Sequence, residues 1–169
     1  MSFFADELAN ISFIPLQAKH LELVRQWRNS SMVNHHMINQ EHITKEQQQQ
    51  WYQSRNSTRE AYFIAQYLGD NIGMFYWTDV SQEASSIQTH GFIGETQWHK
   101  TPVSSLAIIA FYKLCFQQFD MVWGRILKTN KNFLSLQETL SASCTDQGNY
   151  MFCELDKSTF YSSSLAKLL

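Results

Sequence analysis

The chain has 169 residues, of which 44% are hydrophobic, 14% aromatic and 17% charged, and its formal net charge is −2. This length predicts one domain over residues 1–169 with a sizeable core, and the aromatic content excludes a disordered chain. The near-balanced charge and a pI near 6.3 offer no basic surface for a polyanion, so we expect no nucleic-acid partner.

The N-terminal segment, the most apolar run and the cysteines indicate where in the cell the protein is located. The segment MSFFADELANISF carries acidic residues early and lacks the basic and long apolar regions of an export signal. The most apolar run, residues 106–119, is interrupted by a lysine and glutamines, which argues against a membrane span. The chain has an odd number of cysteines, and none of them has a C-x-x-C spacing: Cys115, Cys144 and Cys153. We therefore expect neither a disulfide framework nor a zinc site. The sequence therefore predicts reduced thiols, a cytoplasmic protein and no membrane partner.

The first third of the chain predicts a strand and two helices. ISFIPL is typical of a short strand ended by Pro15, and the apolar spacing over residues 16–27 indicates one helix face. Thr44 and Gln47 have the spacing of a capping box, which predicts the start of a polar helix anchored by Trp51.

A three-strand meander is predicted next. EAYFIAQYLGDNIGMFYWTDV contains two runs of aromatic and β-branched residues around GDNIG, the pattern of a hairpin. SSIQTHGFIGET predicts the third strand, in which Gly91 and Gly94 indicate either a bulge or a close approach of two backbones.

A long buried helix follows at TPVSSLAIIAFYKLCFQQF. Thr101 at the N-cap, followed by proline, predicts a helix over residues 102–119, with the threonine accepting from free N–H groups. The N–H groups of Val103, Ser104 and Ser105 and the positive end of the helix dipole offer a place for a phosphate. The alternative is that the two serine hydroxyls only satisfy the first turn.

The remaining chain predicts two strands and two helices. MVWGRILKTN and NYMFCEL are strand patterns, NFLSLQETL is a short amphipathic helix, and KSTFYSSSLAKLL is a closing helix capped near Ser158. The complete order is that of an α+β domain, with a mixed, mainly antiparallel central sheet and flanking helices.

The order and its motifs resemble the Gcn5-related N-acetyltransferase family over nearly the whole chain, and most closely the sugar-nucleotide N-acetyltransferases of pseudaminic acid synthesis. The similar segments are LVRQWRNSSMVNHHM, ITKEQQQQW, GDNIGMFYWTDV, HGFIGETQWHKTPVSS and RILKTNKNFLSLQETLSA. The resemblance implies acetyl-CoA as cosubstrate, with its pyrophosphate at the start of the buried helix and its pantetheine arm along the preceding strand. It also implies the amine of a nucleotide-linked amino sugar as acceptor.

The resemblance distributes roles over the chain. It implies a cofactor-binding set of Phe92, Ile93, Val103, Ser104, Ser105 and Asn130. Aromatic faces and an arginine fork suit a nucleotide, so the candidates for lining an acceptor or cofactor pocket are Arg28, Asn29, Met37 and Trp77. For the tryptophans the alternative is a place in the core, and for Asn130 it is a turn at the end of a strand. The two loop glycines of the family correspond to Pro102 and Ser104 here, and the tyrosine that protonates the departing thiolate corresponds to Gln137.

The chemistry requires removal of a proton from the attacking amine. His90 and Glu95 are the nearest candidates for the base, because histidine and carboxylate side chains are readily tuned for this task. Gln137 cannot exchange a proton near neutrality, although its amide can orient a thiolate. The adjacent pair His35 and His36 lacks the spacing of metal ligands, so no metal is expected.

Two further functions stay open at this point. One is acetylation of a protein α-amine, and the other is a non-catalytic module that keeps the fold to bind a small molecule or a partner. The tail SSSLAKLL either closes the fold or packs against a second subunit, so a homodimer is also open.

Overall fold

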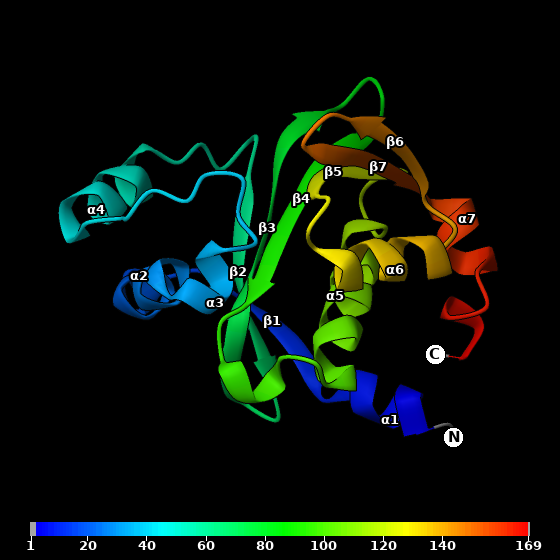
Figure 1. Cartoon of the computed structure of the whole chain (residues 1–169), viewed down its shortest axis with the longest axis horizontal. Helices are drawn as coiled ribbons and strands as arrows, with labels where there is room; N and C mark the ends of the chain where they lie inside the picture. The colour runs from blue at the N-terminus through cyan, green and yellow to red at the C-terminus, as the bar shows by residue number, and fades with distance from the viewer. Residues whose placement is uncertain (1–2, 169) are drawn as a thin grey trace.

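The computed structural model describes residues 3–168, which form a seven-stranded sheet between two groups of helices (Figure 1). Its strand order is β1-β2-β3-β4-β5-β7-β6, and every neighbouring pair is antiparallel except β4 with β5. The predicted fold class, α+β with a mixed and mainly antiparallel sheet, is confirmed. The strands are β1 Ile11–Pro15, β2 Ala61–Tyr67, β3 Asp70–Ser81, β4 Ser86–Ile93, β5 Met121–Leu127, β6 Ser143–Gln147 and β7 Tyr150–Asp156.

The helices cover both faces of the sheet. Figure 1 shows α2, α3 and α4 on one face, and α1, α5, α6 and α7 on the other. No helix in the described part of the chain is long and apolar enough to cross a membrane. The α-helices are α1 Phe3–Ala9, α2 Leu21–Asn29, α3 Ser31–Asn34, α4 Lys45–Ser54, α5 Pro102–Cys115, α6 Lys131–Thr139 and α7 Lys157–Ser162; the 3₁₀ helices are η1 Ala18–His20, η2 Thr96–Trp98 and η3 Ala166–Leu168.

Each face of the sheet has its own core because side chains alternate along a strand. The larger core lies between the sheet and α5, where Phe111 packs against Phe75 and Trp77 with ring centroids 5.3 and 6.0 Å apart. The smaller core lies under α2 and α4 and is built around Trp27 and Ile64. The sheet therefore separates two hydrophobic cores, one on each face.

The parallel pair β4 and β5 is joined over a short stretch only. Its register runs from Ser86 opposite Met121 to Gln88 opposite Trp123 and then stops. Beyond that point β4 continues through residues 89–93 beside β3, and β5 continues through residues 124–127 beside β7. We call the gap between these two segments the splay.

Several predicted elements are confirmed with small changes. The meander, the strand ended by Pro15 and the capping box of Thr44 with Gln47 are all present. The buried helix begins at Pro102 as predicted but ends at Cys115, and a turn follows over residues 116–118. The closing helix begins at Lys157, where the Asp156 carboxylate caps it.

The structure differs from the prediction at one glycine of the meander and at the cap of the buried helix. The register between β3 and β4 runs unbroken through Gly91, so the bulge is wrong. The close approach at Gly91 is to a side chain and not to a second backbone, because a Cβ there would lie 2.3 Å from the ring of Phe75. Thr101 occupies the N-cap of α5, but its hydroxyl donates to the Trp98 carbonyl at 2.8 Å and does not cap the helix.

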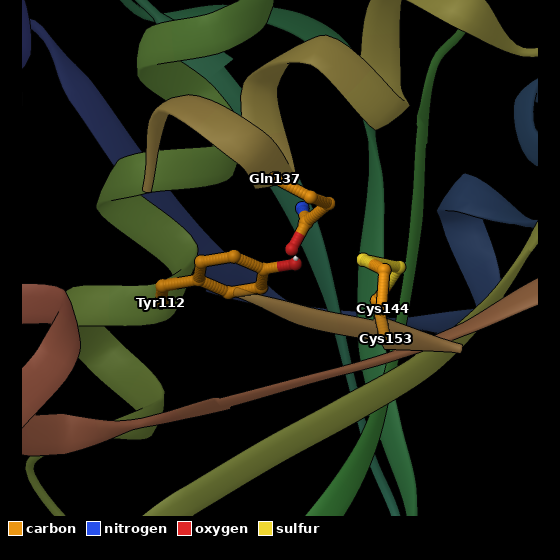
Figure 2. The surroundings of a disulfide bond; sticks show 4 residues. All are labelled: Tyr112, Gln137, Cys144 and Cys153. Carbon is orange, nitrogen blue, oxygen red and sulfur yellow. Dashed lines mark hydrogen bonds between the residues drawn. A yellow bond between two sulfur atoms is a disulfide. The ribbon is translucent and has the colours of Figure 1, made fainter. Parts of the chain in front are cut away.

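The expectation of reduced thiols is wrong for Cys144 and Cys153, which form a disulfide (Figure 2). The cause is strand β6, which the sequence did not reveal because it is exposed along its whole length and has no apolar alternation. It forms a hairpin with β7 that places the two cysteines directly opposite each other. Cys115 remains free and buried in α5.

Candidate active site

Within residues 3–168, the start of α5 has no side-chain cap. With the Thr101 hydroxyl turned toward Trp98, the helix has no side-chain cap within the described chain. The Ser104 hydroxyl and the Ser104 N–H both donate to the Thr101 carbonyl, at 2.8 and 3.2 Å, so the Ser104 side chain does not cap the other first-turn N–H groups. A helix of 14 residues whose N-terminus has no side-chain cap favours an anion at this position.

The loop before α5 is tied to the end of β4. A His99 ring nitrogen, Nε2, lies 2.8 Å from the Ile93 carbonyl oxygen. Lys100 takes a left-handed conformation with φ of 60°, which turns the chain into the helix. Pro102 is exposed, so its ring does not fill the interior of the turn. These contacts fix the N-terminus of α5 beside the outer end of the splay.

The inner end of the splay holds a buried hydrogen bond between two helices. The Gln137 amide on α6 donates to the Tyr112 hydroxyl on α5 at 3.0 Å (Figure 2). Both residues line a cavity of about 20 Å³, together with Thr89 of β4 and Gly124 of β5. Burial raises the pKa of Tyr112 to about 12, against the opposing effect of hydrogen bonds from Gln137 and Thr89. The phenol is therefore protonated at neutral pH.

The other face of the meander carries a row of stacked rings. Tyr62, Tyr76 and His90 occupy paired positions on β2, β3 and β4. The Tyr62 and Tyr76 centroids lie 4.8 Å apart, and those of Tyr76 and His90 lie 4.5 Å apart with an interplanar angle of 8°. Trp51 of α4 meets Tyr62 edge-on at 5.0 Å. The row forms an aromatic floor beneath α2 and α4.

His90 ends this row at the edge of the splay. Its Nε2 atom lies 3.1 Å from the Thr78 hydroxyl. Burial lowers the pKa of His90 to about 4, with Asp79 raising it and Arg125 of β5 lowering it. The imidazole is therefore neutral at pH 7 and can accept a proton, although it is a weaker base than free histidine.

Arg28 lies over the same row from α2. Its Nη1 atom is buried and has no hydrogen-bond partner within residues 3–168, while Nη2 donates to the Asn39 carbonyl at 3.3 Å. Burial lowers the pKa of Arg28, and Tyr76 partly opposes this effect. A half-buried guanidinium with one buried, unpartnered donor is suited to an acceptor oxygen of a ligand.

The other predicted acceptor residues have different surroundings. The Asn29 amide holds the loop before α4, because it both donates to and accepts from the Ile43 backbone at 2.9 Å. Met37 follows α3 in a half-buried turn near Arg28 in sequence. Trp77 is 7% exposed in the larger core between Phe63 and Phe111, so its predicted place in a binding pocket is wrong. Its ring faces α5 because Trp77 is one position away from Tyr76 on β3.

The remaining candidates stand at the ends of the strands beside the splay. The Glu95 carboxylate accepts from the Trp27 indole at 2.9 Å just after β4. The Asn130 side chain accepts from the Phe133 N–H at 3.3 Å and so caps α6. Phe92 packs on the smaller core and Ile93 on the larger one. No group of histidine, cysteine, aspartate or glutamate side chains in the described chain is arranged to hold a metal ion.

The predicted site residues therefore form two groups on opposite faces of the sheet. His90 and Arg28 lie on the side of α2, and Gln137 with the start of α5 lies on the other side. The splay lies between the two groups. The sequence analysis did not identify Tyr112, because a tyrosine inside the apolar run AFYKLC is typical of a core residue. Its phenolic oxygen was the available clue, since a buried hydroxyl needs a hydrogen-bond partner.

No family model matches the chain, and no curated protein sequence matches it. Solved structures do match. Spermidine N-acetyltransferase from Vibrio cholerae in complex with CoA and spermine matches with a TM-score of 0.80 and 11% identity, covering 91% of this chain and 99% of that one. Aminoglycoside acetyltransferase AAC(6′)-Ib in complex with coenzyme A matches with a TM-score of 0.75 and 11% identity, covering 89% and 96%.

A domain from Methanocaldococcus jannaschii matches with a TM-score of 0.74 and 19% identity, covering 86% of this chain and 97% of that one. At these identities the likeness concerns the fold. The chain therefore has the fold of the Gcn5-related N-acetyltransferases over nearly its whole length.

Proposed function

We propose that the protein is an acetyl-CoA-dependent N-acetyltransferase that acts on the amine of a nucleotide-linked amino sugar. The observation that carries the proposal is the splay, which parts β4 from β5 beyond Gln88 and Trp123 and ends at the uncapped start of α5. This gap joins the two faces of the sheet. A thioester entering from the α5 side would meet an amine arriving from the α2 side.

The residues of the α5 side fit coenzyme A. First-turn N–H groups of Val103, Ser104 and Ser105 would hold the pyrophosphate, and the β4 segment at Phe92 and Ile93 would hold the pantetheine arm. Bound acetyl-CoA would supply the activated acetyl group. The Cβ atoms of the family's two glycine positions do not close the site, because Pro102 is exposed and the Ser104 hydroxyl turns back to Thr101.

The residues of the α2 side favour an acceptor that carries an anionic group. Arg28 offers a buried donor without a partner, and Arg125 is close enough to His90 to lower its pKa. The aromatic floor of Tyr62, Tyr76 and His90 offers ring faces for a sugar or a base. A polycation such as spermine would meet both arginines unfavourably. His90 and Glu95 are the candidates for receiving the proton of the amine.

Isothermal calorimetry with acetyl-CoA tests the donor first, and saturable one-to-one binding is the expected result. An acceptor screen then compares amino sugar nucleotides with spermine, an aminoglycoside and a peptide with a free α-amine. Release of free CoA thiol with the sugar nucleotides alone would support the proposal. Preferred turnover of the peptide would replace it with a protein α-amine acetyltransferase.

A matched pair of arginine variants tests the acceptor class. Arg28→Gln is expected to raise the KM for an anionic acceptor at least tenfold and to change the KM for acetyl-CoA little, because the orphan donor faces the acceptor side. Arg59→Gln removes the same charge from an exposed position and is the control. Equal effects of the two variants would contradict the placement.

The small volume at the inner end of the splay favours a second candidate function. A cavity of about 20 Å³ holds about one water molecule, so the strands or α6 must move to admit a thioester. A non-catalytic binding module would keep this cavity closed. Binding of acetyl-CoA without turnover on any amine would select that function. Absence of binding would overturn both enzyme functions, acetylation of an amino sugar nucleotide and acetylation of a protein α-amine.

A further inference from the structure

We propose that a cavity on the α2 face of the sheet binds a free α-amino acid with an apolar side chain, at a site separate from the catalytic centre. The cavity has a volume of about 450 Å³, which lies within the roughly 300–1,000 Å³ usual for small-molecule sites. Its walls come from β1, η1, the first turn of α2 and the hairpin of β2 with β3. The ligand class follows from the groups that these elements present.

The cavity is distant from the candidate catalytic and acceptor residues on the same face. His20 lines the cavity just before α2, whereas Arg28 lies in the last turn of that helix, so about 12 Å of helix separates them. Gln66 of the cavity and Tyr62 of the aromatic floor are four positions apart on β2, which corresponds to about 13 Å. The lining of the cavity includes neither Arg28 nor any residue of the aromatic floor. A ligand in the cavity therefore has a place of its own.

His20 offers the cavity a hydrogen-bond donor of fixed position. The residue is only 5% exposed, and its Nδ1 atom accepts from the Gln17 N–H at 3.1 Å. This bond sets the tautomer, because a ring nitrogen that accepts carries no proton, and Nε2 carries it instead. Burial lowers the pKa of His20 and the neighbouring Lys19 lowers it further, which keeps the ring neutral at pH 7. Within residues 3–168 the Nε2–H group has no hydrogen-bond partner, so it is available to a ligand.

Two amides on the hairpin of β2 with β3 are also oriented before a ligand arrives. Gln66 Nε2 donates to Asn71 Oδ1 at 2.9 Å and to the Gly69 carbonyl at 3.4 Å. Gln66 therefore keeps its Oε1 atom as an acceptor, and Asn71 keeps its Nδ2 atom as a donor; neither atom has a partner in the described part of the chain. Because the two side chains already hold each other, little of their conformational entropy is lost when a ligand binds.

Two opposite charges line the same cavity without pairing. Lys19 comes from η1, and Asp70 is the first residue of β3. Within residues 3–168 neither of them forms an ion pair. Lys19 with the His20 donor suits a carboxylate, and Asp70 with the Gln66 acceptor suits an ammonium group. A small ligand that satisfies both walls must carry one charge of each sign, as the backbone of a free amino acid does.

The apolar part of the cavity indicates the side chain of this amino acid. Ile14 of β1 and Leu23 of α2 line the cavity, and both pack against the smaller core. A ligand whose charges lie between Lys19 and Asp70 would place its side chain against these two residues. Leucine or phenylalanine would bury apolar surface there, whereas a charged side chain would lose its hydration.

Calorimetry with L-leucine and with L-phenylalanine tests the site on the full chain. Saturable one-to-one binding is expected for both. N-acetyl-L-leucine lacks the ammonium group and L-leucinamide lacks the carboxylate, so each is expected to bind at least tenfold more weakly than L-leucine. If neither amino acid binds at millimolar concentration, or if either analogue binds as tightly as L-leucine, the proposal is wrong.

Variants that remove one charge each locate the binding. Lys19→Met and Asp70→Asn change exposed residues with little change of size, and each is expected to weaken leucine binding at least tenfold. Lys157→Met and Asp120→Asn remove the same charges from exposed positions outside the cavity, and both should bind leucine as wild type does. Equal affinities in the cavity variants and their controls would overturn the site.

Binding of leucine as an acceptor at the catalytic centre would give a different result. Arg28→Gln should leave the Kd for leucine within twofold of wild type, because Arg28 does not line the cavity. Loss of leucine binding in Arg28→Gln, with normal binding in Lys19→Met, would move the ligand to the acceptor side and overturn the inference. The titration needs neither CoA nor turnover, so a protein that fails to bind acetyl-CoA but binds leucine overturns the proposed function alone.

Discussion

The Trp27 indole donates to the Glu95 carboxylate at 2.9 Å, and this bond joins α2 to the end of β4. Between them lies Gly94, where an added Cβ would fall 2.1 Å from the Trp27 ring. The tryptophan can reach the carboxylate only because residue 94 has no side chain. Helix α2 also carries Arg28, so this contact helps to fix the position of Arg28 relative to the end of β4.

Gly94→Ala is therefore expected to displace Trp27 and to lower the free energy of unfolding by about 1–3 kcal/mol. Denaturant unfolding monitored by tryptophan fluorescence measures the change. In a Trp27→Leu background the same substitution should cost much less, because the overlapping ring is gone. Equal costs in the two backgrounds would show that the overlap is not the cause.

The depressed pKa of His90 predicts a loss of stability on mild acidification. The folded-state pKa is about 4, below the ordinary value of 6.5, so the unfolded chain binds the proton more tightly. The difference has no effect above pH 6.5 and grows as the pH falls toward 4, reaching roughly 3 kcal/mol. Denaturant midpoints between pH 7.5 and 4.5 measure it.

His90→Phe keeps a ring for stacking on Tyr76 and removes the titrating group. The variant should lose stability less steeply than wild type over this range, since its remaining acid sensitivity comes from other groups. Parallel curves for the two proteins would refute the assignment of the transition to His90.

The disulfide predicts a stability effect confined to oxidising conditions. Cys144 and Cys153 are nine positions apart, and closing such a loop stabilises a fold by about 2–3 kcal/mol. Reduction of wild type and the Cys144→Ala substitution should each remove this amount. Thiol titration of the unfolded chain should detect Cys115 alone before reduction. Three reactive thiols before reduction would show that the bond does not form.

The sequence predicted the parts of the fold that have strong local signals. The capping box at Thr44, the proline at the start of α5 and the aromatic runs of the meander each depend on neighbours in the chain. Strand β6 has no such signal, because all five of its residues are exposed and only pairing with β7 makes it a strand. The disulfide was missed for the same reason.

The sequence names candidate site residues but does not reveal how they are arranged. Periodicity placed His90 on a strand, but the residue it stacks on, Tyr76, follows from the register between β3 and β4. The pairing of Tyr112 with Gln137 spans 25 positions and depends on how α6 packs on α5. No spacing within one element could have indicated it.

The start of α5 gives the most direct test of donor binding. Ser104→Asp places a carboxylate beside first-turn N–H groups that no side chain caps and that we propose to hold a pyrophosphate. Charge repulsion and competition for these donors should weaken binding of CoA at least tenfold in calorimetry, while the negative charge near a helix N-terminus should not lower the melting temperature. Ser54→Asp, at the exposed end of α4, adds the same charge on the other face and is the control. If Ser104→Asp binds CoA as tightly as wild type, the pyrophosphate does not lie at this helix, and the donor must enter the splay by another route.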